Sequence, residues 1–229
     1  MQEKRIKIII YGGNGFVGTH IAERLSQEEN CCIVCLSRSG FKPIHLNHAR
    51  WSESVRWCKG DANTPDLKLL SEADIVIIAI GSAPLPTFSK IAFDQQFHNN
   101  GIAPSNAIKG AAEAGVTRII LMGAKIPFFL NTNYFAYTKG KNTALQSARD
   151  FADISNKHSA TVLQPGAIYG KRYLDDGNVV HLDKIMFPAL KIIPSQFTSV
   201  TKVADRIAKI ALNKDQNNGV FNVLKGKKI

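Results

Sequence analysis

No apolar run in the sequence is long enough to cross a membrane. The longest uninterrupted stretches, such as Ile75 to Ile80, fall far short of the roughly 18 residues that a spanning helix needs. Glu3, Lys4 and Arg5 lead at once into a strand-like run, so we expect no signal peptide or removable presequence. The sequence also lacks internal repeats and low-complexity stretches. We therefore expect one folded domain over residues 1–229.

Cysteine is scarce, with 4 residues in a chain of 229. Cys31, Cys32 and Cys35 lie in one short apolar run that has the length of a buried strand, and Cys58 stands apart. Side chains alternate between the two faces of a strand, so Cys32 and Cys35 cannot bind one metal ion. We expect small buried hydrophobic side chains, no metal site and no disulfide framework. A reducing compartment, cytoplasmic or the mitochondrial matrix, is the expected location.

Acidic residues are fewer than basic ones: the sequence has 18 Asp and Glu and 29 Lys and Arg, which gives a net charge of +11. This balance suits an acidic partner such as a nucleic acid, an anionic membrane surface or a phosphorylated small molecule. The charges are dispersed and no nucleic-acid recognition motif is present, so we expect no nucleic-acid partner. Peripheral contact with a membrane or a protein complex stays open, as does the oligomeric state.

The hydrophobic pattern predicts an α/β fold. Strand-like runs occur at residues 6–11, 31–36, 55–58, 75–80, 118–122 and 161–164, and helical patterns separate most of them. Strands that are apolar on both faces indicate a doubly wound parallel sheet of the Rossmann type, covered by helices on both sides. The less regular segment of about 170–229, with a helix near 201–213 and a strand at 220–223, is interpreted as a small C-terminal substrate lobe on the same sheet.

A glycine-rich loop directly follows the first strand and begins a helix. Such glycines permit a tight turn, close approach of a pyrophosphate and packing of the helix on the strand, while the helix N-terminus attracts phosphates. The alternative is a glycine-rich turn without a ligand. The sequence predicts a dinucleotide-binding loop made of Gly12, Gly13, Asn14, Gly15, Phe16, Val17 and Gly18.

The second strand ends without the carboxylate that usually holds the ribose 2′-hydroxyl of NAD(H). The chain instead reads Ser37-Arg38-Ser39, and a guanidinium suits a 2′-phosphate. NADP(H) is therefore the preferred cofactor and NAD(H) stays possible, the alternative being a solvent-exposed arginine. Asp61 follows the third strand, where it could accept a hydrogen bond from an adenine amino group or serve as a turn carboxylate.

Tyr137 and Lys141 lie four residues apart in a segment with a helical pattern and so share a face. An ammonium beside a phenol favours the phenolate, so we expect a lowered pKa for Tyr137 and a role as general acid or base, although this spacing also arises by chance. Pro104 lacks the N–H that would bond the carbonyl of Asn100. That carbonyl could hold a water that links Lys141 to solvent, or Pro104 could simply begin a helix.

At these residues the chain resembles the short-chain dehydrogenase/reductase superfamily, in its extended and atypical branches, over nearly its whole length. The resemblance implies that Tyr137, Lys141 and Asn100 are catalytic. It adds cofactor contacts to the glycine loop, at Ser37, Arg38, Ser39, Asp61, Ala62, Ile80, Gly81, Ser82, Lys141, Pro165 and Gly166. A narrower likeness, through the loop, Pro43, Trp51 and Trp57, is to atypical members linked to ubiquinone biosynthesis and to the NADPH-binding accessory subunit of respiratory complex I.

The chain departs from the family at the end of the fifth strand, where Gly123 stands in place of the catalytic serine or threonine. Loss of one donor to a developing oxyanion costs on the order of 100-fold in rate. Two functions are therefore expected: an NADP(H)-dependent oxidoreductase, or a non-catalytic NADPH-binding assembly or sensor protein. The apolar segment Ile126-Pro127-Phe128-Phe129-Leu130 favours an apolar, carbonyl or quinone-like substrate, with core packing as the alternative.

Overall fold

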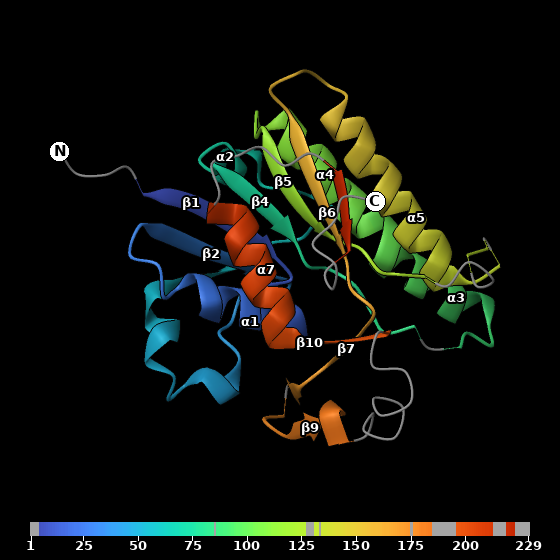
Figure 1. The fold of residues 1–229 in the computed structure, drawn as a ribbon, viewed down its shortest axis with the longest axis horizontal. Helices are drawn as coiled ribbons and strands as arrows, with labels where there is room; N and C mark the ends of the chain where they lie inside the picture. Colours follow the sequence, from blue (N-terminus) through green and yellow to red (C-terminus); the bar gives the residue numbers. More distant parts are fainter. Residues whose placement is uncertain are drawn as a thin grey trace.

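The computed structural model describes residues 5–84, 86–126, 131–132, 134–174, 176–184, 196–212 and 219–222. Its centre is a seven-stranded parallel sheet in the order β11-β6-β5-β4-β1-β2-β3 (Figure 1). The strands are β1 (Ile6–Tyr11), β2 (Cys31–Ser37), β3 (Val55–Lys59), β4 (Ile75–Ile78), β5 (Arg118–Met122), β6 (Ser159–Gln164) and β11 (Gly219–Asn222). The predicted doubly wound α/β fold is confirmed.

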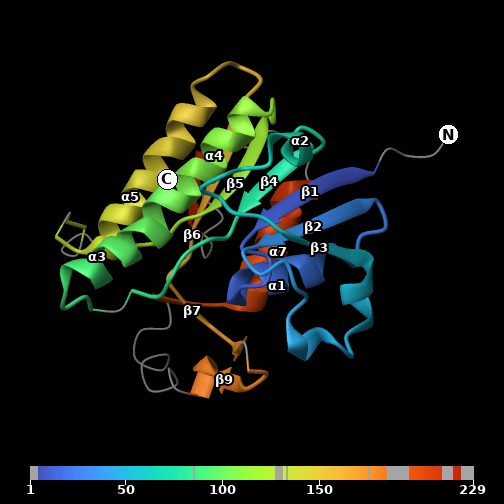
Figure 2. The ribbon, with the colours of Figure 1, turned by 180° about the vertical axis from the view of Figure 1, so that it is seen from behind.

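Helices cover both faces of this sheet. On one face α1 (Phe16–Leu25) and α7 (Val200–Leu212) pack against Ile8 and Ile10 of β1. On the other face α4 (Ala103–Glu113) and α5 (Ala136–Ala152) pack against Ile9 and Tyr11 (Figures 1 and 2). Alternate residues of one strand thus enter two separate cores, and this explains why the strands are apolar on both faces.

Shorter helices connect these elements. They are α2 (Leu67–Leu70), α3 (Lys90–Phe97), the 3₁₀ helices η1 (Ile44–Leu46) and η2 (Arg50–Ser54), and the π-helix η3 (His98–Ile102). The π-helix joins α3 directly to α4, so the backbone stays helical from residue 90 to residue 113. Helices of this kind are rare and occur frequently at functional sites.

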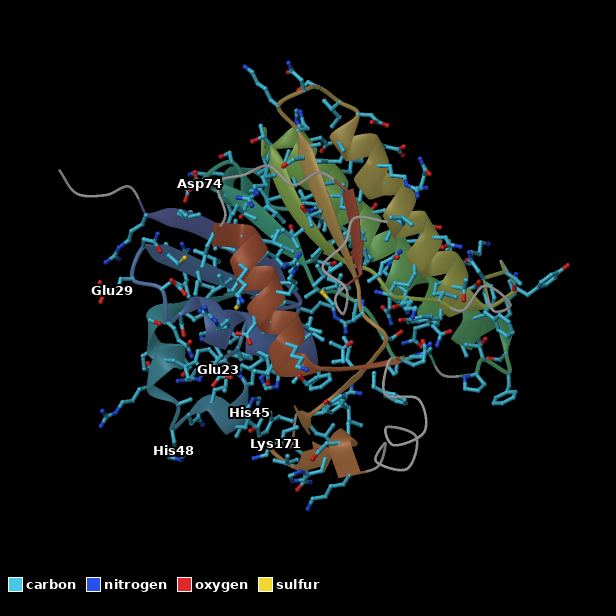
Figure 3. The ribbon with its side chains drawn as sticks, viewed as in Figure 1. Glu23, Glu29, His45, His48, Asp74 and Lys171 are labelled. Atoms are coloured by element: carbon cyan, nitrogen blue, oxygen red, sulfur yellow. The ribbon has the colours of Figure 1, made fainter. Side chains whose placement is uncertain are left out.

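The segment after β6 divides between the main sheet and a small extension. β7 (Ala167–Tyr169) pairs with β10 (Phe197–Ser199), and β8 (Lys171–Tyr173) pairs with β9 (Val179–His181). The last described elements, α7 and β11, instead lie in the main layers, since α7 packs on α1 and β11 pairs with β6. The extension lies beside η1 and α1, since Lys171 of β8 is near His45 of η1 (Figure 3) and its carbonyl oxygen lies 3.4 Å from His20 Nε2 of α1.

The cysteines only partly follow the sequence analysis. Cys35 is buried, and Cys31 and Cys58 are half-buried, but the expectation of burial is wrong for Cys32, which is exposed. Cys32 lies at the amino end of β2, next to the surface, whereas Cys35 lies in the middle of the strand under α1. Among the described residues no helix has the length and hydrophobicity to cross a membrane, and no cluster of His, Cys, Asp and Glu is suited to a metal ion.

Candidate functional site

The glycine loop is a tight turn between β1 and α1 that leaves no room for a side chain at Gly13 or Gly18. The amide of Gly12 donates to the Leu36 carbonyl at 2.9 Å, and the amide of Gly15 donates to the Gly12 carbonyl at 3.0 Å. A Cβ atom on Gly13 would lie 2.4 Å from Cys35 Cβ, and one on Gly18 would lie 2.1 Å from the Gly12 carbonyl oxygen. Glycine is therefore required at these two positions, and the N-terminus of α1 that follows the turn is the kind of helix end that attracts phosphates.

The loop after β2 is connected to the glycine loop by hydroxyl groups. Ser39 Oγ accepts a hydrogen bond from Asn14 Nδ2 at 3.4 Å and lies 3.3 Å from Ser37 Oγ. Ser37 Oγ also accepts from the amide of Gly40 at 3.0 Å, which closes the turn. Arg38 lies between these two serines and is exposed, so its guanidinium is available to an anionic ligand.

Asp61 lies at the carboxyl end of β3, as the sequence predicted. Its Oδ1 accepts hydrogen bonds from the backbone amide of Asn63 at 2.9 Å and from Asn63 Nδ2 at 3.0 Å. This is the turn-forming role of an aspartate. Both of these hydrogen bonds are to Oδ1, and an adenine contact through Asp61 stays a prediction. Ala62 beside it is buried.

Lys141 and Asn100 meet at the carboxyl ends of β4 and β5. Lys141 is 9% exposed and Asn100 is 0% exposed. Lys141 Nζ donates to the Met122 carbonyl at 3.0 Å. A Cβ atom on Gly81 would lie 3.0 Å from Asn100 Oδ1 and 3.2 Å from Lys141 Nζ, so the glycine lets both polar groups approach one backbone position.

Asn100 also fixes the loop that follows β4. Its Oδ1 accepts from the amide of Ser82 at 3.2 Å, and its Nδ2 donates to Ser82 Oγ at 2.8 Å. Gln96, one turn earlier, is buried and donates from Nε2 to the Ala83 carbonyl at 3.0 Å. Sequence reasoning missed Gln96; its spacing of four residues from Asn100 was the available signal.

The expectation of a lowered pKa for Tyr137 is wrong. Burial raises the pKa of its phenol to about 12, because the phenolate loses its water. The Lys141 ammonium, which was expected to oppose this, lies 5.9 Å from the centre of the phenol ring and donates to the Met122 carbonyl instead. Burial also lowers the pKa of Lys141 to about 8.

Pro104 does not begin an isolated helix, because η3 precedes it and the amide of Ala103 donates to the His98 carbonyl. The wider π turn places Asn100 opposite α5 before the proline enters the first turn of α4. A water at the Asn100 carbonyl stays a prediction.

The strand ends around Gly123 are tightly connected. The amide of Gly123 donates to the Leu163 carbonyl at 2.8 Å, and the amide of Lys125 donates to the Pro165 carbonyl at 2.8 Å. A Cβ atom on Gly166 would lie 2.0 Å from the Gln196 carbonyl oxygen, so only glycine fits between β6 and β10. In the segment predicted to line a substrate pocket, residues 127–130 lie outside the described residues.

The site is thus assembled from two parts. The glycine loop, the Arg38 loop and Asp61 lie around the carboxyl ends of β1, β2 and β3. Asn100, Lys141 and the loop of Ile80, Gly81 and Ser82 lie around β4 and β5. Both parts are at the same edge of the parallel sheet, where ligands of open α/β sheets bind.

Comparison with known proteins assigns the chain to a family. A family model described as NAD(P)H-binding matches residues 12–214. Uncharacterized protein At1g32220, chloroplastic, from Arabidopsis thaliana is 31% identical over 199 residues, which is 84% of this chain and 60% of that protein. MIOREX complex component 2 of Saccharomyces cerevisiae is 35% identical over 79 residues, which is 33% of this chain and 28% of that protein. The chain therefore spans less than two thirds of the length of these relatives.

Solved structures share the fold. UDP-glucuronic acid 4-epimerase from Bacillus cereus in complex with NAD has a TM-score of 0.70 and 16% identity, covering 95% of this chain and 76% of that chain. Gre2 from Candida albicans in complex with NADPH also has a TM-score of 0.70 and 16% identity, covering 95% and 77%. The chain belongs to the NAD(P)H-binding family, and it shares its Rossmann-type α/β fold with these structures.

Proposed function

We propose that the protein is an NADP(H)-dependent oxidoreductase that reduces a carbonyl or quinone-type substrate. The observation that carries the proposal is the buried Lys141 ammonium, held beside Asn100 at the sheet edge with Tyr137 one turn away on the same helix. Burying a cation is unfavourable, so this arrangement is better explained by ligand chemistry than by folding. The apolar character of the substrate rests on the sequence of residues 126–130.

Each residue has a chemical task in this function. The glycine loop holds the pyrophosphate, and the bound nicotinamide supplies hydride. Tyr137, with a pKa of about 12, is protonated at neutral pH and donates the proton that completes the reduced alcohol or quinol. Lys141, with a pKa of about 8, is the stronger acid and can give its own proton to the phenolate, after which a proton from solvent restores the ammonium.

The test of catalysis is Tyr137→Phe. The variant should abolish NADPH oxidation measured at 340 nm with a panel of quinones and small carbonyl compounds, while NADPH affinity stays nearly unchanged because the aromatic ring remains. Ser147→Ala, on the same helix and hydrogen-bonded to Ser105 instead, is the control and should retain turnover. Turnover that survives Tyr137→Phe would exclude the phenol as proton donor.

Preference for NADP(H) over NAD(H) is proposed from Arg38. An arginine–phosphate contact contributes enough to change affinity about tenfold or more, so NADPH should raise the melting temperature more than NADH does. Arg38→Asp should remove this difference. Arg149→Asp makes the same charge change on the exposed surface of α5 and should leave it intact. Equal shifts from both cofactors in wild type would refute the preference.

A second function is favoured by Gly123. With no hydroxyl there, the chain lacks a donor that the family uses to orient a carbonyl, and a non-catalytic NADPH-binding assembly or sensor role becomes a specific alternative. This alternative includes a proposed role of the protein in quinone biosynthesis or in a respiratory complex. It predicts no turnover with any substrate of the panel, together with a partner complex that is lost on Gly15→Trp, a change that blocks the N-terminus of α1.

A further inference from the structure

Two glycines that have no task in the proposed function lie against each other next to Asn100 and Lys141. Gly101 is in the π-helix and Gly140 is in α5, immediately before Lys141. A Cβ atom on Gly101 would lie 2.8 Å from Gly140 Cα, and a Cβ atom on Gly140 would lie 2.9 Å from Asn100 Cβ. The two helices therefore touch through their backbones at this point.

This contact determines how closely Lys141 on α5 approaches Asn100 on the π-helix. Gly140 lies against the backbone of Asn100 and Gly101, with a Cβ position 3.0 Å from both Asn100 C and Gly101 N. No flexible side chain lies there that could move aside. An added methyl group would therefore push α5 away from the π-helix and carry Lys141 with it.

We propose that Gly101 and Gly140 are positioning residues that set the Lys141 ammonium against Asn100 and the loop after β4. The proposal rests on the proposed function, and on the cofactor contact of Lys141 that the resemblance implies. The π turn and the glycine pair act together: the turn brings Asn100 to face α5, and the glycines remove the bulk that would keep the two apart. Lys141 then has one defined position, with Nζ bonded to the Met122 carbonyl.

A purely structural role is the competing explanation, and α4 offers a matched control. Gly110 is also helical and also tightly packed, since a Cβ atom there would lie 2.5 Å from Pro65 Cβ. Its neighbours are not part of the site. Gly110→Ala should therefore lower stability without affecting Lys141. Gly101→Ala and Gly140→Ala should lower stability and also displace Lys141.

The experiment compares these three variants with wild type in the full chain. A nuclear magnetic resonance titration follows the Lys141 side chain in the absence of cofactor, and thermal unfolding reports stability. In Gly140→Ala and Gly101→Ala the titration midpoint should rise from about 8 toward the ordinary value of about 10.4, because the ammonium regains water. NADPH affinity should fall about tenfold or more, beyond any loss in Gly110→Ala.

Unchanged titration and affinity in folded Gly140→Ala and Gly101→Ala would overturn the proposal. Where these variants do not fold, Gly140→Ala is placed in a Lys141→Met background, in which the buried charge is gone. If the glycine acts through the lysine, Gly140→Ala should cause no further loss of NADPH affinity there; an equal loss with and without Lys141 would also overturn it. Failure of wild type to bind NADPH would refute the proposed function alone, since the titration needs no cofactor.

Discussion

Lys141 is the residue whose environment is most unfavourable for its own charge. Its ammonium is almost completely buried, donates to one carbonyl, and pairs with no carboxylate among the described residues. Burial lowers its pKa from the ordinary 10.5 to about 8. The charged form is therefore destabilised by folding, by about 3 kcal/mol as an upper figure. Functional sites retain such residues at a cost in stability.

Lys141→Met should raise the free energy of unfolding at pH 7. Below pH 8 the lysine is charged in both states and its burial cost is complete; between pH 8 and 10.5 the folded state loses its proton first, and the cost disappears. The advantage of the variant should accordingly shrink as pH rises through this range. Urea unfolding of both proteins at pH 7 and pH 10 measures this difference in the free energy of unfolding. An advantage independent of pH would mean that the gain comes from packing.

Gly123 carries a second prediction at the residue scale. A Cβ atom there would lie 3.0 Å from Val162 Cγ1 and 3.2 Å from both Gln164 Cγ and the Leu163 carbonyl oxygen. Restoring the family hydroxyl by Gly123→Ser should therefore destabilise the protein by about 1–3 kcal/mol and should not raise turnover. Gly123→Ala carries the same Cβ and should be equally destabilised in thermal unfolding. A serine variant with wild-type stability and increased NADPH oxidation would contradict this.

At the scale of elements, a stacked pair joins the helix after the Arg38 loop to the small hairpin. His45 of η1 stacks on Tyr173 of β8 with ring centroids 3.8 Å apart and planes 3° apart. Next to them His20 Nε2 of α1 lies 3.4 Å from the Lys171 carbonyl oxygen. Among the described residues His45 Nε2 is buried without a hydrogen-bond partner. Burial is the main cause that lowers the pKa of His45, and charge repulsion from His20 lowers it further.

Because the folded pKa of His45 is below its value of 6.5 in the unfolded chain, the unfolded state binds more protons as pH falls. Stability should therefore decrease on acidification from about pH 7 to pH 5. His45→Phe keeps a ring on Tyr173 but cannot be protonated, so it should lose less stability over this range. The exposed His48, replaced by Phe, serves as the control. The measurement is the melting temperature of each protein at pH 7 and at pH 5. An equal decrease in wild type and His45→Phe would exclude His45 as the cause.

At the scale of the molecule, the C-terminal part of the chain completes the sheet that binds the cofactor. Seven residues of α7 are buried, and six of them share one core with α1 and β1. Arg118 at the start of β5 donates to the Ala211 carbonyl at 3.0 Å and to the Ile210 carbonyl, so it caps the end of α7. β11 then covers the edge of β6. The glycine loop near the N-terminus thus depends on segments almost 200 residues away.

A chain that ends at residue 199 should therefore fail to form a stable domain. Removing α7 exposes one face of the sheet, and removing β11 exposes the edge of β6, which favours aggregation. We expect no cooperative thermal transition by circular dichroism and no NADPH binding. Cooperative unfolding with retained NADPH binding would mean instead that the C-terminal segment is a separable lobe.

The sequence by itself determined the sheet, the glycine loop and the family. Apolar strands have a period and length that local sequence reveals, and Gly12 to Gly18 lie within one turn, so their relation needs no tertiary information. The pairing of Tyr137 with Lys141 could also be predicted, because spacing on one helix fixes it.

Only the tertiary structure decided the electrostatics and the long-range contacts. The pKa of Tyr137 rises because burial outweighs a cation that turns toward the Met122 carbonyl, and neither burial nor that carbonyl is visible in the spacing of the two residues. Gly101 and Gly140 are 39 positions apart and meet only after α5 has packed on the π-helix. Desolvation and backbone approach depend on three-dimensional neighbours, which a one-dimensional pattern does not contain.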